Sequence, residues 1–328
     1  MSALPFGVGA RWVLPNPAPI TEVVEAVADL GLAGVLTPSV FDLTDTLDAQ
    51  LLAELADTAK ARGVRLAAGI PYLHPFRLDQ DKHLMQAGDG DPVAGVRRAL
   101  EAVKPLGGRD VPFVLGYVED RFSTVVPWED QLRLSTQLLG KLAPVLRDLE
   151  LRLCIKTHEE ITTFEIVRMI EAVGDDVLSV GFDPVNVYLR MEDPLLALDR
   201  VAPYVGHVYV DDATFVSTGQ SLARRLCPLG NGLLDWSAIL ARLADSAPEL
   251  WIDLHKGQYG ISPYDSTWTT AHPDLSVYEY GRVVNAATTA ARSFTTAEAE
   301  GLTAAQADVH SRFLPAVRTM SGYSLTWR

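Results

Sequence analysis

The feature that most constrains the fold of this sequence is an alternation, repeated about eight times, of short apolar runs with longer amphipathic stretches. Apolar residues in the longer stretches recur at three- and four-residue spacing, which is typical of helices that bury one face. The short runs are typical of buried strands, and they cover residues 6–14, 34–37, 64–71, 111–117, 151–156, 178–183, 207–212 and 250–255.

Strand-then-helix units in this number predict an α/β fold with parallel strands and crossover helices, which closes most simply as a (β/α)8 TIM barrel. A doubly wound open sheet is the alternative, but the sequence has no GxGxxG turn after its first strand. Without a low-complexity linker, we expect residues 1–328 to form a single domain. The tail from about residue 274 predicts the eighth helix and a further C-terminal helical extension.

Charge and composition restrict the partners. The formal net charge is −14, and an acidic surface of this kind repels phosphate backbones and anionic lipid, so we expect no nucleic-acid or membrane partner. Two cysteines without a CxxC pattern predict neither a disulfide framework nor a zinc site. The sequence shows no signal-peptide pattern and no apolar run of about 18 residues, so we expect a cytoplasmic protein with a small-molecule substrate.

Polar side chains gather where the last four predicted strands end, the end at which barrels of this type carry their active sites. The catalytic candidates are Lys156, Asp183, Tyr209, Asp253, His158 and His255. The substrate-binding candidates are Asn186, His207 and Arg225. Because the first four strands end in mostly apolar or small residues, the pattern favours a site on the second half of the barrel.

Several of these residues also have a structural interpretation. Asp183, which precedes a proline, could simply cap a turn. Of Asp211 and Asp212, we expect one to be solvated. Arg225 lies on the stretch after the seventh strand, where contact with an anionic group of the substrate and a solvated position are both open. The expected mouth loops, 71–92, 118–128, 213–232 and 256–274, carry no recognisable motif.

The second half of the chain resembles the xylose isomerase-like TIM barrel superfamily, which includes sugar phosphate isomerases and epimerases and the AP endonuclease family 2-like proteins. The residues that carry the resemblance lie between about 150 and 255: LCIKTHEEITTFEIVRMIEAVGDD, GFDPVNVYLRMEDPLLALDRVAPYVGHVYVDDA, PLGNGLLDW and LWIDLH. The first half matches only in its strand–helix rhythm. The resemblance implies an enzyme of sugar metabolism, an isomerase, an epimerase or a lyase.

The resemblance also implies a metal site made of Glu, Asp, His and Glu, one from each of the last four strands, that binds Mn or Mg. In this sequence those positions hold Lys156, Asp183, Tyr209 and Asp253. Only Asp183 matches outright, Asp253 is a shorter stand-in, and Lys156 and Tyr209 are poor ligands for such an ion. A lysine there places a fixed positive charge where the metal charge would be, so we expect no metal and no other cofactor. The alternative is an ion held by Asp183, His207 and Asp253.

Three functional hypotheses follow. The first is a metal-independent, sugar isomerase- or epimerase-like enzyme for a small polyhydroxylated or keto substrate, with Lys156 as electrophile or Schiff-base nucleophile and Tyr209, His158 or His255 moving protons. The second is a metal-dependent isomerase, epimerase or dehydratase (a lyase) with atypical ligands. The third is a non-catalytic barrel that binds a small molecule. Members of the resembled family commonly form dimers or tetramers, so a homo-oligomer is also an expectation.

Overall fold

A computed structural model of the protein describes residues 4–14, 18–217, 221–246, 248–254, 258–293, 315–320 and 322. Within these residues, parallel strands form one eight-stranded sheet, and each strand overlaps with one of the eight apolar runs of the sequence. The strands are β1 (Leu4–Gly9), β2 (Leu32–Thr37), β3 (Arg65–Ala68), β4 (Asp110–Phe113), β5 (Arg152–Lys156), β6 (Leu178–Phe182), β7 (Val205–Val210) and β10 (Glu249–Ile252).

The order of the strands shows how the sheet curls into a barrel. Hydrogen-bonded neighbours follow the order β3-β2-β1-β10-β7-β6-β5-β4. The chain just beyond β3 meets the end of β4, where the backbone N–H groups of Ile70 and Leu73 donate to the carbonyls of Pro112 and Val114 at 3.1 and 3.3 Å. The nearly closed ring confirms the predicted (β/α)8 TIM barrel.

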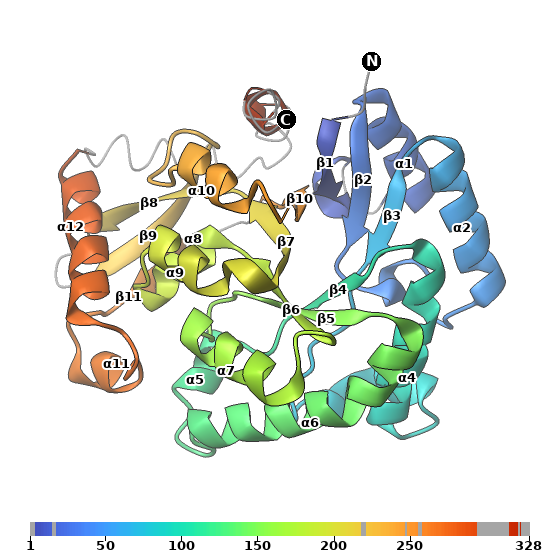
Figure 1. Cartoon of the computed structure of the whole chain (residues 1–328), viewed down its shortest axis with the longest axis horizontal. Helices are drawn as coiled ribbons and strands as arrows, with labels where there is room; N and C mark the ends of the chain where they lie inside the picture. The colour runs from blue at the N-terminus through green and yellow to red at the C-terminus, as the bar shows by residue number, and fades with distance from the viewer. Residues whose placement is uncertain are drawn as a thin grey trace.

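Helices lie around the outside of the strands (Figure 1). Thr162 and Glu165 form a capping box that fixes where α7 begins. The helices are α1 (Ile20–Asp29), α2 (Ala49–Ala61), α3 (Lys82–Ala87), α4 (Pro92–Val103), α5 (Val118–Arg121), α6 (Trp128–Leu149), α7 (Thr163–Val173), α8 (Pro184–Val187), α9 (Pro194–Val201), α10 (Trp236–Leu243), α11 (Ser266–Thr270) and α12 (Val277–Ser293).

Two large rings fill the inside of the barrel, and glycines on the facing strands make room for them. A methyl group on Gly7 would lie 2.4 Å from Cζ3 of Trp251 and 2.7 Å from the carbonyl oxygen of Gly34. A methyl group on Gly181 would lie 3.0 Å from Cε2 of Tyr209. Trp251 and Tyr209 are both almost completely buried. The barrel is therefore a packed core with its free space at the mouth.

The stretches that follow the seventh and the eighth barrel strands differ from the expectation. Parts of 213–232 and 256–274 were expected to be loops, but they contain β8 (Asp212–Ser217), β9 (Leu222–Cys227) and β11 (Gln258–Ile261), which pair antiparallel in the order β11-β9-β8. Helix α12 lies beside this small sheet at one side of the barrel (Figure 1). The sequence of β9, LARRLC, has two consecutive arginines, so it does not alternate between apolar and polar residues as a strand pattern would. This explains why the strand was not predicted.

The C-terminal part contains the predicted helix from about residue 274, seen as α12. Residues 315–320 are helical, and the remainder of the expected extension lies outside the described residues. None of the helices in the described ranges is both long and apolar enough to cross a bilayer. Cys154 and Cys227 are both buried.

The packing inside the barrel predicts that Gly7→Ala lowers the free energy of unfolding by about 1–3 kcal/mol, because the added methyl group overlaps the Trp251 ring and the β2 backbone. Gly140→Ala is the matched control. Gly140 lies inside α6 with open space around it, so alanine there should raise stability by about 0.5–1 kcal/mol. Urea unfolding of both variants checks this, and a Gly7→Ala protein as stable as the wild type would show that the ring is not tightly packed.

Candidate active site

The mouth of the barrel carries a lysine between two carboxylates. Lys156 is the last residue of β5, Asp183 follows β6, and Asp253 follows β10. The ammonium nitrogen Nζ of Lys156 lies 2.9 Å from Oδ2 of Asp253 and 3.2 Å from Oδ2 of Asp183. It also lies 3.8 Å from the centre of the Tyr209 ring, within range of a cation–π attraction. The structure thus brings together the four residues that the sequence placed at the strand ends.

Neighbouring groups hold both carboxylates in place. The Trp12 indole N–H donates to Oδ1 of Asp253 at 2.7 Å, and the Asn186 side-chain amide donates to Oδ2 of Asp183 at 3.0 Å. The Asp183 side chain makes no cap to α8, so the turn-capping interpretation of this residue is wrong. The carboxylate belongs to the lysine cluster instead.

The charge state of Lys156 follows from its partners. Burial alone lowers the pKa of this ammonium, but the charges of Asp253 and Asp183 and their hydrogen bonds outweigh burial and raise the pKa above its ordinary value. The pKa of the Tyr209 hydroxyl is also raised, chiefly by burial, so Tyr209 stays protonated. The cluster therefore holds a charged ammonium beside a neutral phenol.

The donor atoms present do not fit a divalent metal ion. The ammonium of Lys156 already occupies the space between the two carboxylates, and an ammonium has donors only. Within the described ranges, no three residues among His, Cys, Asp and Glu are arranged to hold a metal. His207 lies two residues deeper in β7, with Nε2 2.9 Å from Glu249 at the opposite end of the barrel. It is not brought to the lysine cluster as the alternative ligand set required.

A cavity of about 560 Å³ opens above the cluster. Lys156, His158, Tyr209 and Asp253 form one wall. The rest of the lining comes from the first half of the chain, so the cavity extends beyond the second half of the barrel that the sequence favoured. These lining residues are Arg11, Trp12, Leu36, Thr37, Pro38, Ser39, Phe41, Asp42, Ile70, Pro71, Tyr72, Asp81, His83, Pro112, Phe113 and Val114.

The remaining sequence candidates have different positions. His158 lines the cavity, and its Nδ1 lies 2.6 Å from Oε2 of Glu160. Asn186 is buried between Asp183 and Arg224, whose Nη1 lies 3.2 Å from the Asn186 amide oxygen. Arg225 is on β9 rather than on a loop, and it does not line the cavity. His255 lies outside the described residues.

Sequence reasoning missed three residues around the cluster. The Trp12 indole lies close to Gly9 and reaches Asp253. A methyl group added at residue 9 would lie 2.8 Å from the indole, so the glycine makes this position of the ring possible. Arg224 was expected on a loop, where it could contact an anionic group of the substrate, but it lies on β9 with its guanidinium beside Asn186. Glu160 was not considered. Asp211 and Asp212 are both fully buried, so the expectation that one of them is solvated is also wrong.

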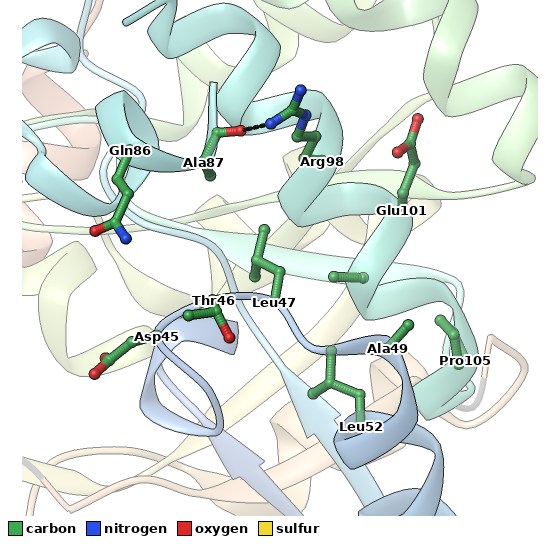
Figure 2. A pocket seen from close by; sticks show the side chains of 11 residues that line it. Asp45, Thr46, Leu47, Ala49, Leu52, Gln86, Ala87, Arg98, Glu101 and Pro105 are labelled. Atoms are coloured by element: carbon green, nitrogen blue, oxygen red, sulfur yellow. Dashed lines mark hydrogen bonds between the residues drawn. The ribbon is translucent and has the colours of Figure 1, made fainter. Parts of the chain in front are cut away.

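A second hollow of about 470 Å³ lies away from the mouth, between the stretch before α2 and helices α3 and α4 (Figure 2). Its arginine, Arg98, donates to the carbonyl of Ala87 and to Asp89. Glu101, also at its wall, comes from α4. The walls of this hollow hold no group comparable to the buried lysine between two carboxylates at the mouth.

Comparison with known proteins agrees with this architecture. The family model described as "Xylose isomerase-like TIM barrel" matches residues 24–254. The crystal structure of D-psicose 3-epimerase in the presence of D-fructose superposes with a TM-score of 0.60 at 18% sequence identity, covering 87% of this chain and 99% of that one. At this identity the superposition shows a shared fold.

Two curated relatives match parts of the chain. Uncharacterized protein YihM of Escherichia coli (strain K12) is 27% identical over 177 residues, which is 53% of this chain and 52% of that protein. The chain thus spans about half the length of this relative. The 3-oxo-isoapionate decarboxylase of Pectobacterium atrosepticum is 24% identical over 228 residues, which is 69% of this chain and 73% of that protein.

The charge balance of the cluster predicts the effect of removing its cation. Lys156→Met should lower the free energy of unfolding by about 3–5 kcal/mol at neutral pH, because two neighbouring carboxylates are left without their partner. Adding Asp183→Asn to this variant should restore a large part of the loss. Denaturant unfolding of the two variants measures both effects. If Lys156→Met alone is as stable as the wild type, the ion pairing described above is wrong.

Proposed function

The chain belongs to the xylose isomerase-like TIM barrel family, and from that premise we propose that it is an enzyme. Its substrate is a small keto compound with hydroxyl groups like those of a sugar, and the reaction proceeds through an enolate. The observation that carries the proposal is the Lys156 ammonium, held at the cavity wall by Asp183 and Asp253. Isomerisation or epimerisation is the first reaction class, since both proceed by proton transfer at the carbon beside a carbonyl.

Lys156 acts in this proposal by its charge. A negative charge develops on the carbonyl oxygen as the enolate forms, and an ammonium fixed beforehand beside that oxygen stabilises it without reorganisation. The raised pKa of Lys156 favours this role over a Schiff base, which requires the neutral amine as nucleophile. Asp183 and Asp253 serve to hold the ammonium in position and charged.

The proposal is a metal-independent reaction. Metal-dependent members of such a family would use a divalent ion to polarise the same oxygen. Here the donor set supports a cation supplied by the chain itself, since Lys156 lies between the two carboxylates that such an ion would need. No step in the proposed reaction requires a metal.

Decarboxylation of a β-keto acid is a second candidate. In that reaction the carbon–carbon bond to the carboxylate breaks, CO₂ leaves, and its electron pair forms the enolate, so no base has to remove a proton. The wall of the cavity offers two groups held in their protonated forms, Lys156 and Tyr209, which suits a reaction that needs charge stabilisation more than a base. The similarity to a 3-oxo-isoapionate decarboxylase supports the same class.

A substrate panel in deuterated water tests the first class. Ketoses and keto-sugars that are substrates should incorporate deuterium at the carbon beside the carbonyl, as followed by NMR. Lys156→Met should lower kcat by about 100-fold or more, as expected when a group that stabilises an oxyanion is removed. Lys104→Met, on the outer surface, is the control and should leave kcat unchanged. Turnover by Lys156→Met at the wild-type rate contradicts the role of Lys156.

The second class is tested by CO₂ release from β-keto acids of sugar-like structure. Decarboxylation should depend on Lys156 in the same way, and borohydride added during turnover should leave the mass of the protein unchanged because no Schiff base forms. A reduced adduct on Lys156 would show that the lysine acts as a nucleophile and would overturn the electrostatic role.

A further inference from the structure

A histidine and a buried glutamate form a pair beside the lysine cluster. Nδ1 of His158 lies 2.6 Å from Oε2 of Glu160. A carboxylate can only accept a hydrogen bond, so Nδ1 carries the proton and donates it. The other ring nitrogen, Nε2, has no hydrogen-bond partner within the described ranges, and His158 lines the mouth cavity. The imidazole therefore presents Nε2 to a bound substrate.

Glu160 is held rigidly. Its carboxylate is completely buried, and Oε1 accepts the backbone N–H of Gly116 at 2.9 Å. Its own carbonyl accepts Nη1 of Arg121 at 2.8 Å, and Arg121 is fixed by the buried ion pair with Glu165 at 2.9 Å. Both the backbone and the carboxylate of Glu160 are therefore held in place, which sets the orientation of the His158 ring.

The charges around His158 determine its protonation. Burial lowers the pKa of His158, and so does the nearby Lys156 ammonium. The charge and hydrogen bond of Glu160, together with the charge of Glu159, outweigh both and raise the pKa above its ordinary value. The raised pKa favours the imidazolium form of the ring.

We propose that Glu160 is a positioning residue that fixes His158 as the proton donor of this site, with Nε2 aimed at the carbon of the enolate that Lys156 stabilises. This inference rests on the proposed function. In the step, the electron pair of the enolate double bond forms the new C–H bond, the Nε2–H bond of His158 breaks, and the carbonyl is restored. His158 is left neutral and regains its proton from water.

The alternatives for the proton donor are less suited to it. Tyr209 is almost fully buried, with the Lys156 ammonium over its ring, and its raised pKa makes it a weak acid. Lys156 is engaged by two carboxylates. His158 lines the cavity and has its Nδ1 engaged by Glu160, which leaves Nε2 as the ring nitrogen for a substrate.

The first test needs no substrate. NMR of the protein with ¹⁵N-labelled histidine should show the His158 imidazolium persisting above the ordinary histidine pKa of about 6.5, with Nδ1 protonated throughout. Glu160→Gln should lower the midpoint by about one pH unit or more, since an amide keeps the size of the side chain and removes its charge. A midpoint at or below the ordinary value in the wild type, or one that Glu160→Gln leaves in place, overturns the proposal.

The second test is kinetic. Glu160→Gln and His158→Gln should each lower kcat by about 100-fold with little change in KM, and the alkaline limb of the kcat profile should move to lower pH in Glu160→Gln. Because Glu160 acts through His158, adding Glu160→Gln to His158→Gln should cost almost nothing further. Losses in kcat that multiply, or a fall in kcat without a shift of the pH limb, would show a merely structural role.

Glu249→Gln is the matched control. Glu249 forms a pair of the same kind with His207 at 2.9 Å, at the other end of the barrel. This variant should lose stability and keep the wild-type pH profile. If no keto substrate is turned over, the proposed function fails, while the NMR midpoints still decide whether Glu160 holds His158 as an imidazolium.

Discussion

The ion pairing of Lys156 with Asp183 and Asp253 is the interaction on which the mouth of this barrel depends. The ammonium lies within hydrogen-bonding distance of both carboxylates in a place with little access to water, where each charge would be unfavourable alone. Their mutual neutralisation allows β5, β6 and β10 to end in charged side chains. It also places a permanent cation at the wall of a cavity large enough for a small substrate.

The packing below the mouth positions this cluster. Trp251 and Tyr209 fill the barrel because Gly7, Gly34 and Gly181 face them without side chains. The ring face of Tyr209 lies under the Lys156 ammonium, so Tyr209 belongs both to the core of the barrel and to the lysine cluster. At the opposite end of the barrel, Glu249 is paired with Arg65 and His207.

Much of the fold and part of the site could be predicted from the sequence, for identifiable reasons. Apolar runs and helical spacing located all eight barrel strands, and strand ends located Lys156, Asp183 and Asp253. The β8–β9–β11 sheet could not be found, because paired arginines in β9 hide its alternation. The contact of Trp12 with Asp253, and the part of the cavity lining that comes from the first half of the chain, depend on how loops distant in sequence are placed. Strand periodicity does not encode that placement. In the sequence, Glu160 is one of two consecutive glutamates before a helix, and only the structure shows that it is buried and paired with His158.

The central claim is that the cation of this site belongs to the chain and replaces a divalent ion. Metal content after equilibration with Mn²⁺ and Mg²⁺, followed by removal of free ions, tests this claim most directly. The account predicts that the protein retains only sub-stoichiometric metal and that a chelator leaves its turnover unchanged. A stoichiometric divalent ion bound at the mouth, with activity lost on chelation and restored on its return, would contradict the account.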